Sequence, residues 1–158
     1  MIAVSMWSDP PECPILPEGT VHVWRARLNQ PASTDRMETA LSSDQRVKAG
    51  RIANETQRRR YIVSHGILRD ILAFYLGLTP QEVSFHYGPH GKPEIDGPAG
   101  PDTVRFNMSH CRDLAVYAVS RVRRVGVDVE FVRPDSNTEL VAKRFFSDEE
   151  NRVLGRTP

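Results

Sequence analysis

The sequence has few cysteines, no long apolar run and almost no excess charge of either sign. Cys13 and Cys111 are far apart and lack metal-ligand spacing, which argues against a disulfide framework or a zinc site and favours a reducing setting. No apolar stretch approaches the ~20 residues that a helix needs to cross a bilayer. The N-terminus carries acidic residues and prolines in place of a signal sequence. We therefore expect a cytoplasmic protein with no membrane partner.

Charge and length narrow the class of protein further. The 21 basic and 20 acidic residues give a net charge of +1, which argues against a protein that coats nucleic acid, and aromatic residues are not interleaved with the basic ones. With 158 residues, 39% of them hydrophobic, the chain can form one globular domain or two very small ones.

The first half of the chain predicts one strand followed by two helices. Residues 20–28 are rich in β-branched and aromatic side chains, which is typical of a strand. Capping patterns at Ser42 and Asn54 predict two successive helices, the second ending at Gly77. Apolar residues recur at three- and four-residue steps along this second helix, so one of its faces should be buried.

The second half predicts strands and short helices around a loop rich in glycine and proline. A cap at Thr79 predicts a short turn of helix. We then expect strands over 83–87, 104–108, 114–120 and 125–131, with the loop at 88–101 and helices over 138–145 and after Ser147. The short connection at 121–124 predicts that the last two strands form an antiparallel hairpin. The fold class expected is α+β, with helices packed on a mainly antiparallel sheet.

Two carboxylates stand two positions apart in the last predicted strand, Gly126-Val127-Asp128-Val129-Glu130. Side chains at i and i+2 of a strand share a face, so Asp128 and Glu130 point one way while Val125, Val127, Val129 and Phe131 point the other. Mg²⁺ favours one or two carboxylates beside substrate phosphates. The pattern is therefore that of a candidate metal site, although an exposed acidic strand face would look the same.

A second polar cluster is Asn107-Met108-Ser109-His110. A catalytic Ser-His pair is disfavoured, because adjacent strand residues point apart and no aspartate is placed to orient the histidine. A hydroxyl and an imidazole can instead donate to phosphate oxygens. A purely structural histidine remains the alternative.

Basic residues form two further candidates for phosphate binding. Lys92 stands between Gly91 and Pro93, and a lysine on so tight a turn can be aimed at a phosphate, although it can equally be a surface lysine. A basic run flanks the start of the long helix, where anions bind well, although such a run is more often a solvated face. Its members are Arg46, Lys48, Arg51, Arg58, Arg59 and Arg60.

Each of these signals is weak alone, but their order and spacing are specific. The series R-R-R-Y, H-Y-G-P-H-G-K-P, F-N-M-S-H, G-V-D-V-E and A-K-R-F-F-S-D-E-E resembles the 4′-phosphopantetheinyl transferases. The resemblance is to their larger, pseudo-dimeric, surfactin-synthetase-activating type, and it extends over roughly residues 24–150.

The resemblance implies an activity and a set of site residues. Such enzymes transfer the phosphopantetheine arm of coenzyme A to a serine of an acyl or peptidyl carrier protein, with Mg²⁺ on the coenzyme A pyrophosphate. Asp128 and Glu130 match the catalytic metal carboxylates. The resemblance implies that the coenzyme A phosphates are bound by Lys48, Arg60, Lys92, Ser109 and His110. It also implies that basic surface attracts the carrier, which is typically acidic.

The family carries a W-x-x-K-E motif some tens of residues beyond F-F-S, whereas this sequence ends at Pro158. We therefore expect an irregular lead-in at 1–19, an N-terminal subdomain at 20–124 and the truncated start of a C-terminal subdomain at 125–158. The chain can be part of a longer, monomeric enzyme, a natural short form that self-associates, or an inactive copy. A coenzyme A or carrier-binding module without catalysis is the alternative function.

Overall fold

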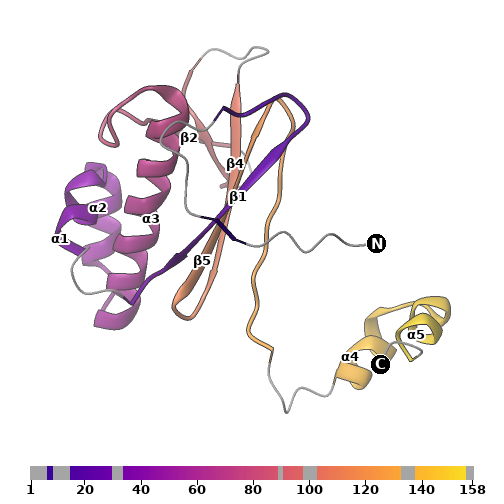
Figure 1. Cartoon of the computed structure of the whole chain (residues 1–158). Coiled ribbons are helices and arrows are strands. Elements are labelled where there is room, and N and C mark those ends of the chain that lie inside the picture. Colours follow the sequence, from indigo (N-terminus) through magenta and orange to yellow (C-terminus); the bar gives the residue numbers. More distant parts are fainter. Residues whose placement is uncertain are drawn as a thin grey trace.

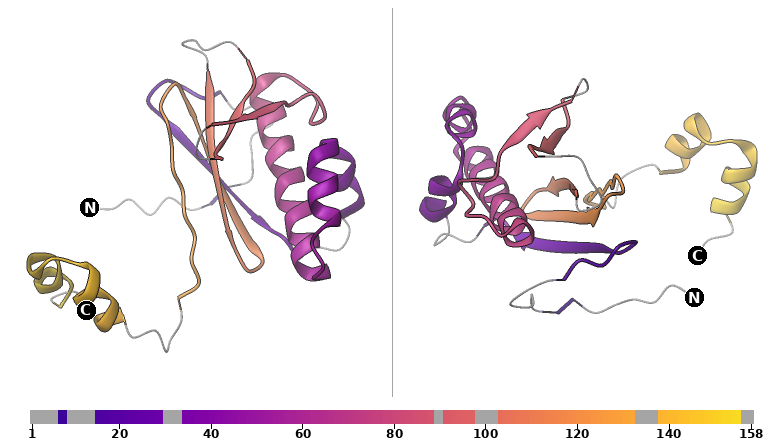
Figure 2. Two further views of the ribbon diagram at one scale, coloured as in Figure 1. Left: turned by 180° about the vertical axis from the view of Figure 1, so that it is seen from behind. Right: turned by 90° about the horizontal axis from the view of Figure 1, so that it is seen from above.

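Figure 1 shows the computed structural model of the chain, which describes residues 7–8, 15–29, 34–88, 91–97, 103–132 and 138–155. One helix packs on one face of an antiparallel sheet, two shorter helices pack on that helix, and a small second sheet lies near the edge of the first. The view from above in Figure 2 places the three helices together on one side of the sheet. The α+β class expected from the sequence is confirmed.

The main sheet has the order β1-β5-β4, so β5 is its central strand. β1 (Val21–Arg27), β4 (Val104–Cys111) and β5 (Leu114–Arg121) follow the strands predicted from β-branched residues, and β5 pairs antiparallel with both neighbours. β2 (Phe85–Tyr87) and β3 (Pro93–Ile95) pair in a second sheet. The sequence did not indicate β3, because it lies within the glycine- and proline-rich segment expected to be a loop.

The helical layer consists of α1 (Thr34–Ala40), α2 (Ser43–Gly50) and α3 (Glu55–Leu76). The predicted caps are present, since the side chains of Ser42 and Asn54 accept hydrogen bonds from the third residue of α2 and α3. Gly77 ends α3 with a φ of 67°, a left-handed conformation that glycine adopts at little cost. No pattern in the sequence indicated α1.

The core lies between α3 and the inner face of the sheet. Leu68, Leu72 and Val63 of α3 pack with buried strand residues such as Phe106 and Tyr117. The Tyr117 hydroxyl donates to the Ser64 carbonyl at 3.0 Å, and burial raises the pKa of this tyrosine above its usual range. This hydrogen bond fixes the position of α3 relative to the central strand, β5.

Residues 79–82 form a hydrogen-bonded turn, and the short helix predicted there is absent. The backbone N–H and hydroxyl of Thr79 both donate to the Glu82 carboxylate at 2.7 Å. The capping interaction inferred from the sequence is therefore present, but the chain leaves the turn toward β2 before a helix can propagate.

The segment predicted as a strand over residues 125–131 forms no β-ladder, and the predicted hairpin with β5 is wrong. Both edges of β5 are already paired, with β1 and β4. Val122 adopts a φ of 63° and turns the chain away from β5. The backbone of 125–129 is then bound by side chains of β4 and of the β2–β3 region, which take the place of ladder partners.

Two short helices end the described chain. α4 (Thr138–Phe145) has the predicted bounds, and α5 (Asp148–Leu154) begins at a capping box between Ser147 and Glu150. Figure 1 shows both helices standing away from the main sheet. Among the described helices, none has the length and hydrophobicity needed to span a membrane.

Close packing of α1 on α3 gives a stability prediction. A Cβ added to Gly66 would lie 2.6 Å from the Met37 Cβ and 2.9 Å from its backbone, so Gly66→Ala should lower the free energy of unfolding by about 1–3 kcal/mol. Gly50→Ala is the matched control, because no atom lies within 4 Å of its added Cβ. Urea unfolding of both variants tests this, and equal stabilities would contradict the packing.

Candidate functional site

The candidate site is built around β4, an outer strand of the main sheet, and uses both of its faces. Phe106 packs against α3 in the core, so the alternation of a strand places Met108 and His110 on the same inner face. Asn107 and Ser109 therefore project from the outer face. The expectation that Ser109 and His110 point apart follows from the same alternation.

Two outer-face side chains of β4 bind the segment that carries the carboxylates. Asn107 Oδ1 accepts from the Val127 N–H at 2.8 Å, and Ser109 Oγ accepts from the Val129 N–H at 3.3 Å. Ser109 Oγ also donates to Asp128 Oδ1 at 2.6 Å. These bonds advance together along both segments, so residues 127–129 run parallel to β4.

The alternation predicted for 125–130 is present even without a ladder. Val125, Val127 and Val129 are half-buried, whereas Asp128 and Glu130 are exposed. Glu130 Oε2 accepts a weak hydrogen bond from the Cys111 thiol, with 3.7 Å between oxygen and sulfur. The structure therefore places both carboxylates beside the C-terminal end of β4.

Phe131 departs from the pattern predicted for the valine face. Its side chain is 44% exposed, and the Arg112 guanidinium carbon lies 3.2 Å from the centre of its ring. Arg112 itself has a φ of 53° in the tight β4–β5 turn. A cation–π contact therefore covers one side of this ring, in place of packing against the sheet.

On the other side of β4 lies a cavity of about 210 Å³ between α2, α3 and the β2–β3 sheet. Its lining joins two predicted phosphate-binding residues, Lys48 and Lys92, to Met108 on the inner face of β4. Lys48 Nζ lies 5.6 Å from the centre of the Tyr61 ring, and Lys92 Nζ donates to the Val125 carbonyl at 3.0 Å. Lys92 thus links the cavity to the segment that carries the carboxylates.

His65 is a lining residue of this cavity that the sequence analysis missed. Its ring stacks on Tyr61, with 3.9 Å between centres, and its Nδ1 lies 2.9 Å from the Tyr61 carbonyl. Because a carbonyl only accepts, Nδ1 is the protonated nitrogen of the neutral ring. A histidine four residues after a tyrosine in a helix gives no signal of its own, since only the fold brings the cavity to it.

Burial is the main reason that His65 stays neutral. It lowers the pKa of His65 to about 4, the hydrogen bond to the Tyr61 carbonyl partly opposes this, and electrostatic interactions with Lys48 and His110 lower it further. Burial also raises the pKa of Tyr61 to about 12. The cavity is therefore lined by the neutral rings of Tyr61 and His65 and by the positively charged side chains of Lys48 and Lys92.

Arg60 is not among the residues that line the cavity. Its guanidinium pairs with Asp113 in the β4–β5 turn, with 2.9 Å from both Nε and Nη2 to Oδ1. Its contact with a phosphate stays a prediction. The pair ties the first turns of α3 to the end of β4 and so helps to position the site.

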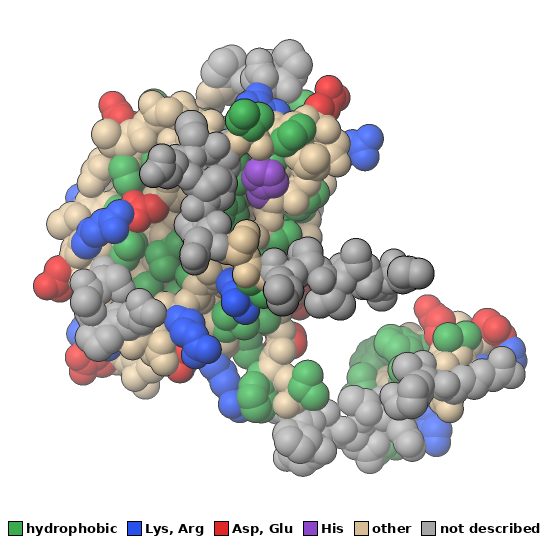
Figure 3. Space-filling model, viewed as in Figure 1, with side chains coloured by type: hydrophobic (Ala, Val, Ile, Leu, Met, Phe, Trp, Pro, Cys, Tyr) green, Lys and Arg blue, Asp and Glu red, His purple; other side chains and the backbone are tan. Residues whose placement is uncertain are grey.

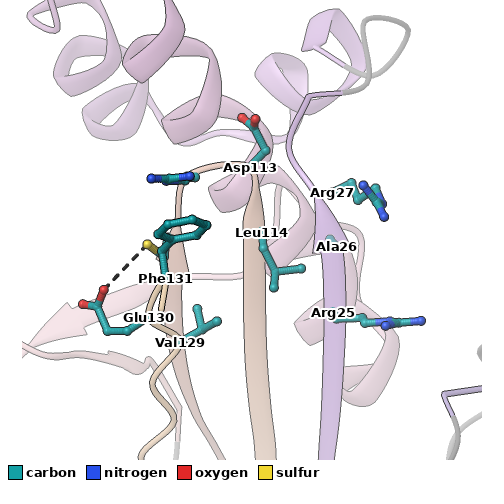
Figure 4. Close-up of a pocket in the computed structure, with 10 residues that line it drawn as sticks. Arg25, Ala26, Arg27, Asp113, Leu114, Val129, Glu130 and Phe131 are labelled. Carbon is teal, nitrogen blue, oxygen red and sulfur yellow. Dashed lines mark hydrogen bonds between the residues drawn. The ribbon is translucent and has the colours of Figure 1, made fainter. Parts of the chain in front are cut away.

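A wider cleft of about 550 Å³ adjoins Glu130 at the far end of β4 (Figure 4). Arg25 and Arg27 of β1 lie on one side of it, Glu130 and Phe131 on the other, and Leu114 stands between them. The sequence analysis did not anticipate this cleft, because its walls come from three segments far apart in the chain.

Asp128 and Glu130 carry exposed carboxylate oxygens of the kind that bind metal ions. Within the described ranges, no group of three or more histidine, cysteine, aspartate or glutamate side chains is arranged to hold one. Two exposed carboxylates nevertheless fit Mg²⁺, which takes few protein oxygens and completes its shell with water and phosphate.

Comparison with known structures first defines the fold. The chain superposes on a holo-(acyl-carrier-protein) synthase from Bacillus anthracis, solved in complex with CoA (3′,5′-ADP), with a TM-score of 0.50 and 16% sequence identity. The match covers 64% of this chain and 93% of that protein. The chain therefore has the holo-(acyl-carrier-protein) synthase fold.

Sequence comparison then identifies the family, although no family model matches the chain. It is 40% identical over 150 residues to the 4′-phosphopantetheinyl transferase HetI of Nostoc sp., covering 94% of this chain and 63% of HetI. It is 29% identical over 153 residues to a phosphopantetheinyl transferase of Thraustochytrium sp., covering 89% of this chain and 53% of that protein. The chain belongs to the 4′-phosphopantetheinyl transferase superfamily, and it spans between half and two thirds of the length of these relatives.

The buried histidine gives a pH prediction. The pKa of His65 is 6.5 in its ordinary state and about 4 in the fold, so the unfolded chain binds a proton more readily between these values. The contribution of His65 to the free energy of unfolding should therefore fall as pH falls from about 6.5 to about 4, by about 3 kcal/mol at most.

NMR titration of the His65 ring, assigned by its loss in His65→Gln, measures this directly. A midpoint well below pH 5.5 is expected. A midpoint near 6.5 would show that the ring is neither desolvated nor close to Lys48 and His110.

Proposed function

We propose that the protein containing this chain transfers the 4′-phosphopantetheine arm of coenzyme A to a serine of an apo carrier protein. The observation that most directly supports this proposal is the arrangement around β4. Two carboxylates lie on one face of this strand, and a lysine-lined cavity lies on the other. Cationic groups and a metal site around one pyrophosphate are what phosphoryl transfer requires. The names of the relatives support the same reaction.

In this proposal Lys48, Lys92 and His110 bind the phosphates of coenzyme A. The two lysines line one cavity, and Lys48 and His110 are both close enough to His65 to lower its pKa. Their charges would neutralise phosphate oxygens and hold the pyrophosphate in one orientation. The reaction joins the serine oxygen to the pantetheine phosphorus, breaks the pyrophosphate P–O bond to the adenosine side, and releases adenosine 3′,5′-bisphosphate together with the proton of the serine hydroxyl.

Ser109 takes a different part from the phosphate contact implied by the resemblance. Its single hydroxyl hydrogen is donated to Asp128, and its oxygen accepts from the Val129 N–H. We therefore assign it the positioning of the carboxylate segment.

Asp128 and Glu130 are the residues that would hold Mg²⁺. The ion, when bound, supplies positive charge to the pyrophosphate of coenzyme A. Asp128 offers it Oδ2, because Oδ1 accepts from Ser109, and Glu130 carries only the weak thiol contact. A coenzyme A-binding or carrier-binding module without catalysis is the second candidate, since the described residues supply two carboxylates and no third.

The boundary between subdomains is part of the same proposal. Residues 20–124 would form one subdomain with its own core, and 125–158 would begin another that presents the metal carboxylates to it. The packing of α3 on a sheet formed within 21–121, and of α1 and α2 on α3, supports this division. The reducing setting suggested by cysteine usage supports a cytoplasmic location.

Replacing one carboxylate tests the metal site. Asp128→Asn should lower transfer from labelled coenzyme A to an apo carrier protein at least about 100-fold, because it removes charge from the ion's site. Asp44→Asn, at an exposed aspartate in the first turn of α2, is the matched control.

Calorimetry on this chain separates the two candidates. Binding of coenzyme A that Mg²⁺ strengthens in the unaltered chain and not in Asp128→Asn supports the site, and binding without transfer favours the module. Mg²⁺-dependent transfer by Asp128→Asn at the rate of the unaltered chain would contradict the assignment.

A further inference from the structure

The cleft of about 550 Å³ beside Glu130 is not explained by coenzyme A binding. Its lining shares no residue with the lysine-lined cavity and begins where the metal carboxylates end, at Val129 and Glu130. The cavity adjoins Asn107, whereas the cleft adjoins Cys111. The cavity therefore lies on the inner side of β4, whereas the cleft lies at the C-terminal end of this strand, where Glu130 lines it and Asp128 is two residues away.

Three cations of the cleft lack an acidic partner. Arg25, Arg27 and Arg112 form no ion pair within the described ranges, whereas the cleft's Asp113 is paired with Arg60. Arg25 and Arg112 lie over aromatic rings, which attract a cation without neutralising its charge. Figure 3 shows basic side chains gathered over the lower end of the sheet. An acidic partner would find complementary charge here.

Apolar side chains lie among these cations. Leu114 and Phe131 are 37% and 44% exposed, and both line the cleft together with half-buried Val129. Exposed apolar groups ringed by charge are typical of protein docking surfaces, in which apolar contact gives affinity and the charged rim gives orientation. A small free anion would leave this apolar surface uncovered.

We propose that this cleft docks an acidic, partly apolar surface of the carrier protein next to its acceptor serine. The inference rests on the proposed function, which requires the serine to reach a phosphate held at Asp128 and Glu130. The lysine-lined cavity is taken by coenzyme A in that proposal, and the cleft is the hollow that adjoins Glu130 on the other side. Docking there brings the serine to the metal-bound phosphate.

Charge reversal on β1 tests the docking surface. Arg25→Glu combined with Arg27→Glu should weaken binding of a net-negative apo acyl carrier protein at least about tenfold. The matched control is Lys143→Glu with Arg144→Glu, an equal charge change at exposed residues of α4. Affinity is measured by fluorescence anisotropy of the labelled carrier, and calorimetry gives coenzyme A affinity, which the β1 variant should leave unchanged.

A salt titration of the unaltered chain needs no variant, and carrier affinity should fall steeply as KCl rises. Equal carrier affinity for the β1 variant and the unaltered chain would overturn the docking surface and leave the proposed function standing. An equal loss in the control would also overturn it, because the effect would then be one of net charge. If the unaltered chain binds coenzyme A but no carrier protein, the docking surface is overturned and the coenzyme A site stands.

Discussion

The hydrogen bonds from Asn107 and Ser109 to the backbone of Val127 and Val129 are the constraint on which the site depends. They replace a strand ladder with side-chain contacts, and so hold a segment against β4 that has no ladder partner of its own. The same Ser109 hydroxyl binds Asp128. One strand therefore sets both the path of the chain and the orientation of a carboxylate.

The second constraint is the burial of α3 on the inner face of the sheet. It places Tyr61 and His65 over the end of β4 and closes a cavity against the β2–β3 sheet. Arg105 of β4 and Glu94 of β3 form an ion pair of 2.7 Å, which holds the small sheet, and with it Lys92, beside the main one. Cations that are far apart in the sequence thus gather around the strand that also binds the carboxylates.

Local chemistry explains what the sequence could predict. The caps at Ser42, Asn54 and Ser147, the glycine that ends α3 and the valine-carboxylate alternation are all patterns of a few residues, and the structure confirms each. The order and spacing of the motifs along the sequence indicated the family. Most of the predicted site residues lie on or close to β4 and its neighbours. They are Lys48, Lys92, Ser109, His110, Asp128 and Glu130.

The features that escaped prediction depend on tertiary structure. A strand propensity at 125–131 could not show that both edges of β5 were already occupied. The pairing of Arg60 with Asp113 joins residues that only the packing of α3 brings together. His65 lines the cavity, and the arginines of β1 line the cleft, through the same kind of distant contact.

The central claim is that β4 holds Asp128 and Glu130 as a metal site next to the coenzyme A phosphates. Paramagnetic broadening of amide NMR signals by Mn²⁺, measured with coenzyme A bound to this chain, tests it most directly. The account predicts selective broadening at Ser109 and at residues 127–130, with the signals of α1 unaffected. Uniform weak broadening, or broadening centred on another acidic residue, would contradict it.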